Sequence, residues 1–89
     1  MQEKWLIRLI NSDENNDLIA AYYTENPKQQ LETFYFCKGH DIPIQIPDNF
    51  ENKNYKYNDK EAGLIYEIEV GFGNEETYCT IDVYLEKIY

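Results

Sequence analysis

Strict alternation of apolar and other residues is clearest in the last third of the chain. It runs through 64–72 and returns over 77–89, a pattern typical of half-buried strands. Gly73-Asn74 between the two segments is a hairpin signal. A longer loop, from Gly73 to Glu76, would keep the same side chains on the same faces. We therefore predict an antiparallel C-terminal hairpin, 64–89.

The alternation assigns a face to each hairpin residue. The face predicted to pack against the core comprises Leu64, Tyr66, Ile68, Val70, Phe72, Cys79, Ile81, Val83 and Leu85. The outward face carries Ile65 and Thr80 together with the candidate partner-binding residues Glu67, Glu69, Tyr78, Asp82, Tyr84 and Glu86. With the longer loop, Glu67 would lie opposite Asp82, and like charges across a ladder are mildly destabilising. The outward face therefore has a charge pattern that stability alone does not favour.

The first part of the chain predicts two more strands. Trp5–Ile10 alternates, and the polar segment 11–17 that follows is predicted to turn. Leu18–Thr24 then forms a second strand, although Asp17 could instead cap a short helix. We predict a strand here, with the helix as the alternative.

The middle of the chain is more varied. Gln29–Lys38 could begin as a helix, but the aromatic residues of its second half favour a strand. Pro43 and Pro47 restrict 42–47 to an edge strand or an extended strap, because proline cannot donate to a ladder. The polar segment 48–62 is predicted to be a surface loop, with a short strand around Tyr55–Tyr57 as an alternative.

Together these segments predict one mainly β domain over 1–89. We expect an antiparallel sheet of about five to seven strands, arranged as a meander, a sandwich or a partly open barrel. One short helix, giving an α+β domain, is the alternative.

Charge narrows the classes of partner. The chain has 17 acidic and 8 basic residues, a formal net charge of −9. Such a chain repels nucleic acids and anionic membranes, and it attracts cations and basic proteins. Ordinary solubility is the other explanation of the charge. With no long apolar segment and no signal-peptide pattern, we expect a cytoplasmic protein.

Candidate catalytic and metal-binding residues are few. Cys37 and Cys79 are expected to be reduced thiols in strands, with a disulfide as the alternative. Together with His40, the single histidine, they fall short of a four-ligand zinc site. His40 beside Asp41 lacks the remaining parts of a nucleophilic centre. The acidic turn 13–17 lacks the glycine and terminal glutamate of an EF-hand. We expect no enzyme, cofactor or metal site.

The outward face of the hairpin is therefore the main candidate for function. Carboxylates and tyrosines suit recognition of a basic protein, whereas a merely solvated sheet face is the alternative. In size, charge, aromatic content and lack of a catalytic motif, the chain resembles small acidic bacterial immunity proteins of contact-dependent inhibition and bacteriocin systems. The resemblance implies a cytoplasmic inhibitor that binds a toxin domain, often a basic nuclease, in a 1:1 complex.

Two other functions fit the same composition. A phage-encoded inhibitor, such as an anti-CRISPR protein or nucleic-acid mimic, would present carboxylates in place of phosphates. A small structural or assembly subunit would instead form a homo-oligomer through an apolar edge such as Ile42–Ile46.

Overall fold

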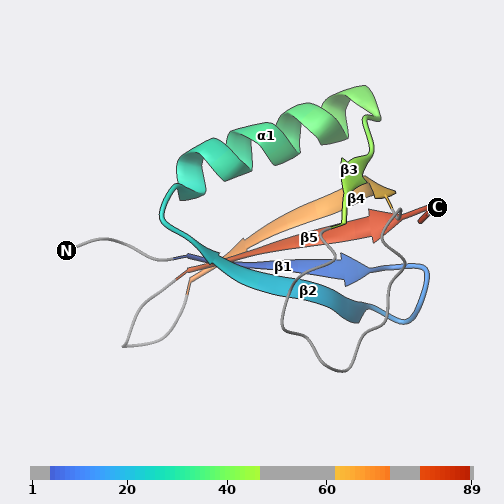
Figure 1. Cartoon of the computed structure of the whole chain (residues 1–89), viewed down its shortest axis with the longest axis horizontal. Coiled ribbons are helices and arrows are strands. Elements are labelled where there is room, and N and C mark those ends of the chain that lie inside the picture. Colours follow the sequence, from blue (N-terminus) through green and yellow to red (C-terminus); the bar gives the residue numbers. More distant parts are fainter. Residues whose placement is uncertain (1–4, 47–61, 73–78, 89) are drawn as a thin grey trace.

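The computed structural model describes residues 5–46, 62–72 and 79–88, which form a curved five-stranded sheet with one helix (Figure 1). Its elements in chain order are β1 (Trp5–Asn11), β2 (Asp17–Thr24), α1 (Pro27–His40), β3 (Ile44–Gln45), β4 (Ala62–Gly71) and β5 (Thr80–Glu86). The sheet is a half-barrel, so the prediction of a mainly β, partly open barrel is confirmed. Within the described residues, no helix has the length and apolar character of a membrane span.

The strand order is β2-β1-β5-β4-β3. Adjacent strands are antiparallel except for β1 and β5, which pair in parallel at the centre of the sheet. The predicted C-terminal hairpin is confirmed by the antiparallel pairing of β4 with β5. The parallel pair was not predicted, because it joins the two ends of the chain and depends on how the two hairpins dock.

The prediction of a strand at Gln29–Lys38 is wrong, because Pro27–His40 forms α1. Pro27 lies in the first turn of the helix, where a backbone N–H would have no hydrogen-bond partner within the helix, so its missing N–H costs no bond. Phe34 and Cys37, three positions apart, are buried on one side of the helix. Aromatic strand propensity is weak, and burial of this helical stripe outweighs it. The predicted strand at Leu18–Thr24 is confirmed, and its helix alternative is not.

The core lies between α1 and the face of the sheet that this helix covers (Figure 1). Ile7 on β1 and Ile81, Val83 and Leu85 on β5 are completely buried, as expected for the two central strands. Phe34 is the main aromatic contribution of α1 to this core. The alternation in β5 therefore predicted the inward side chains Ile81, Val83 and Leu85.

In β4 the predicted faces are partly wrong, because a bulge interrupts the alternation. The register shifts between Ile65 and Glu67, so the intervening Tyr66 has no partner in β5. Ile65 is consequently buried, whereas Tyr66 is 60% exposed and Leu64 is only half-buried. Phe72, just beyond the strand, is 83% exposed rather than part of the core.

The turn between β1 and β2 is pinned to the end of β5. Asn15 and Asn16 adopt positive φ angles, which asparagine tolerates well. The Ser12 hydroxyl donates to the Leu85 carbonyl at 2.7 Å, and the Lys87 N–H donates to the Asp13 carboxylate at 2.7 Å. The acidic turn therefore has a structural role in holding the two hairpins together.

The described part of segment 42–47, residues 42–46, is confirmed as an edge element, since Ile44–Gln45 forms β3 and pairs with the start of β4. Ile46 is 2% exposed and belongs to the core, while Ile42 is 39% exposed. The predicted loop 48–62 lies outside the described residues except for Ala62, and so does the hairpin turn at Gly73–Glu76.

Candidate functional site

The candidate site is the sheet face opposite to α1, called here the outer sheet face. Its polar residues on the described strands are Arg8, Tyr23, Glu67, Glu69, Thr80, Asp82, Tyr84 and Glu86. The register places Arg8 on β1 beside Asp82 on β5, and Asp82 beside Glu69 on β4. Glu67 lies opposite Tyr84 rather than opposite Asp82, because β4 and β5 pair two residues away from the register expected for the four-residue loop. The described members of the predicted cluster therefore share one face, in a register that was not predicted.

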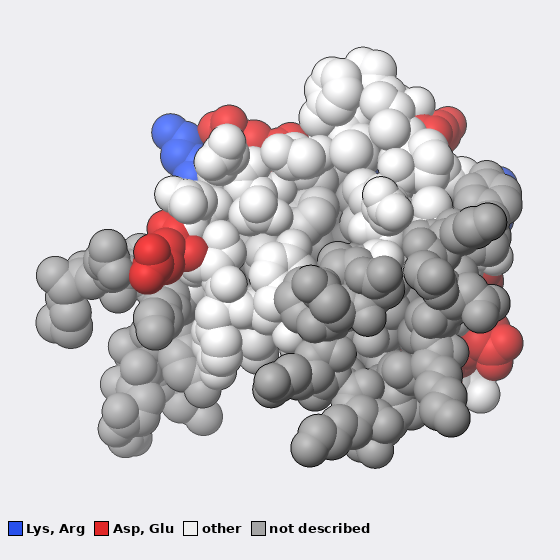
Figure 2. Space-filling model, in the orientation of Figure 1, with Lys and Arg blue, Asp and Glu red and all other residues white. Residues whose placement is uncertain are grey.

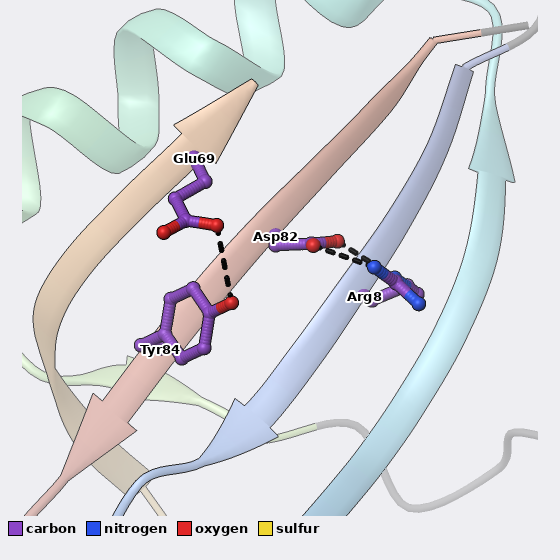
Figure 3. A network of polar contacts seen from close by, with 4 residues as sticks. All are labelled: Arg8, Glu69, Asp82 and Tyr84. Carbon is purple, nitrogen blue, oxygen red and sulfur yellow. Dashed lines mark hydrogen bonds and ion pairs between the residues drawn. The ribbon is translucent and has the colours of Figure 1, made fainter. Parts of the chain in front are cut away.

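Arg8 and Asp82 form the centre of this face (Figure 3). The Arg8 Nε donates to Asp82 Oδ1 at 2.7 Å, and Nη2 donates to Oδ2 at 2.6 Å. The hydrogen bond to Asp82 raises the pKa of Arg8 above its ordinary value, so the guanidinium remains charged. The Asp82 side chain is only 11% exposed. Asp82 is consequently a buried, neutralised carboxylate, and it is not available to a partner as a free charge.

Glu69 and Tyr84 form the second contact of the outer sheet face. The Tyr84 hydroxyl donates to Glu69 Oε2 at 3.2 Å, and Figure 3 shows the two side chains pointing toward one another from β4 and β5. Partial burial, followed by the negative charge of Glu69, raises the pKa of Tyr84 above that of an ordinary phenol. Tyr84 is therefore a neutral hydroxyl at physiological pH, held in place by a carboxylate.

Glu67 is engaged with α1 and with its own strand. Its Oε1 accepts from the Ile68 backbone N–H at 2.9 Å and from Lys38 Nζ at 3.0 Å. These two contacts, in that order of importance, lower the pKa of Glu67 below the ordinary carboxylate value. Glu67 thus satisfies a backbone donor beside the bulge and links β4 to α1, which reduces its availability for a partner.

The remaining predicted site residues are Glu86 and Tyr78. Glu86 is half-buried opposite Leu64, and no described basic side chain bonds to it. Tyr78 lies outside the described residues. Of the predicted set, Glu69, Tyr84 and Glu86 therefore form the part that remains open to a partner.

The other chemical candidates do not converge on a catalytic arrangement. The Cys37 side chain is buried in the core, whereas His40 is exposed at the end of α1. His40 Nδ1 lies 2.9 Å from the Phe36 carbonyl oxygen, a contact within its own helix. Across the described residues, no three His, Cys, Asp or Glu side chains are placed to hold a metal ion. Cys37 and Cys79 are free thiols, and Cys79 is half-buried.

Sequence reasoning missed a second set of exposed residues, on α1. Tyr35 is 48% exposed and Phe36 is 57% exposed, although both were assigned to a strand. A helical reading of 27–40 would have found them, because Leu31, Phe34 and Cys37 recur every three positions. That spacing leaves the two aromatic residues between Phe34 and Cys37 on the other side of the helix.

The chain was compared with protein-family models, curated proteins and solved structures, and none of them matches it.

Proposed function

We propose that the protein is a non-enzymatic inhibitor that binds and neutralises a basic protein. The partner class that fits best is a toxin nuclease domain bound 1:1, which would make the chain an immunity protein. The observation that carries the proposal is the open part of the outer sheet face. There, Glu69 and Tyr84 are hydrogen-bonded to each other and lie on the same face as Glu86. No described basic side chain is bonded to these three residues.

The charge distribution supports a basic partner. Among the described residues, only Asp82 and Glu67 are in ion pairs with basic side chains. The other described carboxylates remain uncompensated, in a chain of net charge −9. An uncompensated field of this sign accelerates association with a positively charged protein and discriminates against acidic ones.

The construction of the face supports binding rather than catalysis. The Arg8–Asp82 pair bridges β1 and β5, and Asp82 lies directly beside Glu69 of the open residues. Tyr84 is held by Glu69, so its ring is positioned before a partner arrives. A rigid tyrosine with a fixed hydroxyl is a favourable interface anchor, because little conformational entropy is lost on binding.

Two other functions remain as alternatives. A phage-encoded inhibitor or nucleic-acid mimic would use the same carboxylates, and it would compete with nucleic acid for its partner. The buried Asp82 interrupts the row of free negative charges that such a mimic needs. A structural or assembly subunit would self-associate, but Ile46 of the expected apolar edge is buried in the core.

The test is affinity capture from the source cell at low and high salt with charge-reversed variants. The variant Glu69→Lys with Glu86→Lys changes the open face, and Glu14→Lys with Glu25→Lys makes the same change of charge at exposed positions elsewhere. We expect the wild type and the control to retain a basic nuclease domain at 1:1, and the face variant to lose it. Recovery of only the protein itself, as a salt-insensitive oligomer, would contradict the proposal. Equal retention by all three proteins would reject the outer sheet face.

A further inference from the structure

The second exposed feature of the molecule is the solvent side of α1. Its members, called here the α1 aromatic face, are Glu32, Tyr35, Phe36 and Gly39. In the space-filling view, the C-terminal end of α1 rises at upper right as an uncharged surface with acidic atoms at its margin (Figure 2). Two large aromatic side chains on the exposed side of a helix are not explained by packing within the chain, because the core takes Phe34 and Cys37 instead.

Helical spacing brings the four residues together. Glu32 precedes Tyr35 by three positions and Phe36 by four, so its carboxylate lies one turn from both rings. Gly39 follows the same two residues by four and three positions. The surface thus consists of a carboxylate, two aromatic rings and a position with no side chain, in order along the helix.

Gly39 leaves space beside the rings. Nothing lies within 4 Å of the point where a Cβ on Gly39 would be, and the φ of this residue is not positive. A glycine inside a helix costs about 1 kcal/mol relative to alanine, and here neither the backbone conformation nor a neighbouring atom requires it. A group from outside can therefore approach Tyr35 and Phe36 over this turn of the helix.

Phe36 has a ring contact within α1, and the acidic residue of the face has no basic partner among the described residues. His40 stacks on Phe36 with ring centroids 4.3 Å apart, which holds the Phe36 ring in place. Lys38 is bound to Glu67 at 3.0 Å, so the nearest lysine is already neutralised. Among the described residues, no basic side chain is in an ion pair with Glu32, not even Lys28 one turn before it. Glu32 is therefore a carboxylate without a described basic partner on the same helix face as the rings.

We infer that the α1 aromatic face binds an arginine side chain of a basic protein, an inference that rests on the class of partner in the proposed function and not on the outer sheet face, which lies on the other side of the sheet. A planar guanidinium stacks on an aromatic ring while its N–H groups donate to a carboxylate. Tyr35 and Phe36 provide the rings, Glu32 provides the acceptor, and Gly39 provides the room. A second copy of the chain is a poor occupant of this face, because each copy carries a net charge of −9.

The inference is tested by NMR titration of the full chain with synthetic deca-arginine, deca-lysine and deca-citrulline peptides. Deca-lysine has the same charge without the planar group, and citrulline has nearly the same shape without the charge. We expect deca-arginine to bind most tightly and to shift the amide signals of Tyr35, Phe36 and Gly39. Deca-citrulline should not bind measurably.

Four variants locate the binding. Tyr35→Leu and Phe36→Leu keep an apolar side chain and remove the ring, so each should weaken deca-arginine binding about two- to five-fold. Gly39→Leu fills the open space without changing a ring and should weaken binding by a similar factor. Phe72→Leu removes a ring that is 83% exposed elsewhere and should leave the affinity unchanged. Circular dichroism of each variant checks that α1 is retained.

Three results would overturn the inference in different ways. If Glu69→Lys with Glu86→Lys weakens deca-arginine binding while the three α1 variants do not, the α1 aromatic face is rejected and the proposed function stands. If neither cationic peptide binds the wild type at low salt, the inference fails together with the electrostatic basis of the proposed function. Equal affinities for deca-arginine and deca-lysine that no ring variant changes would show that charge alone drives binding, which also rejects the inference.

Discussion

Arg8 and Asp82 are 74 positions apart in the sequence, and they form a two-point ion pair between β1 and β5. The two residues are unequally exposed, since the side chain of Arg8 is 42% exposed and that of Asp82 is 11% exposed. The pair lies in the only parallel pairing of the described sheet, where the first and last described strands meet. The ion pair therefore stabilises the pairing of β1 with β5.

The unequal burial predicts unequal costs of removing each partner. Arg8→Leu leaves the buried Asp82 carboxylate without its donor, beside Glu69, and should lower the free energy of unfolding by about 2–3 kcal/mol. Asp82→Leu leaves an arginine that water can reach, and should cost about 1 kcal/mol. Urea unfolding monitored by Trp5 fluorescence measures both.

The double variant Arg8→Leu with Asp82→Leu is the control for this prediction. It removes both charges together, so it should be more stable than Arg8→Leu alone. If Asp82→Leu proves more destabilising than Arg8→Leu, the unequal desolvation of the pair is not what determines its contribution to stability.

The bulge in β4 makes a prediction about neighbouring residues. Ile65 is 6% exposed and Tyr66 is 60% exposed, the reverse of the alternation in the sequence. Ile65→Ala should lower the free energy of unfolding by about 2–4 kcal/mol, because it creates a cavity in the core. Tyr66→Ala should cost less than about 1 kcal/mol. A larger loss of stability for Tyr66→Ala than for Ile65→Ala, in thermal or urea unfolding, would contradict the bulge and favour the unbulged register.

Two glycines are predicted to respond in opposite ways to alanine. A Cβ on Gly63 would lie 3.2 Å from both Leu85 Cβ and Ile88 Cγ1, in a closely packed part of the sheet. Gly63→Ala should therefore destabilise the protein by about 1–3 kcal/mol. Gly39→Ala, in open space on α1, should stabilise it by about 0.5–1 kcal/mol. Differential scanning calorimetry of the two variants and the wild type gives the comparison.

The lowered pKa of Glu67 predicts that the stability of the protein depends on pH. This pKa is lower in the folded protein than the ordinary value of 4.5, because Ile68 and Lys38 donate to the carboxylate. The contribution of Glu67 to stability is therefore fully present above the unfolded pKa, and it is lost as the pH falls through the lower folded pKa. The stability difference between wild type and Glu67→Gln should be largest at neutral pH and should shrink in acid.

The matched control for the pH prediction is Glu14→Gln, an exposed glutamate in the first turn. Urea midpoints of the three proteins between about pH 7 and pH 3 test the prediction. NMR titration should place the Glu67 carboxyl below 4.5, and Lys38→Gln should move its pKa back toward that value. A pKa at or above 4.5 in the wild type would contradict the proposed role of the two donors.

The sequence by itself determined the features that depend on local periodicity. The mainly β class, the C-terminal hairpin and the burial of Ile81, Val83 and Leu85 all follow from alternation, because successive side chains of a strand point to opposite faces. The excess of negative charge follows from composition alone. The placement of Glu69 and Tyr84 on one face also follows from this periodicity, whereas their hydrogen bond depends on the strand register.

The tertiary structure alone decided three other features. Pro27–His40 is a helix because Phe34 and Cys37 can reach the core together only at helical spacing. Tyr66 points outward because a bulge adds one residue to β4, and no local pattern marks its position. Asp82 is neutralised because Arg8 lies beside it in the parallel pairing of β1 with β5. Each feature depends on contacts between segments that are distant in the chain, which local periodicity does not contain.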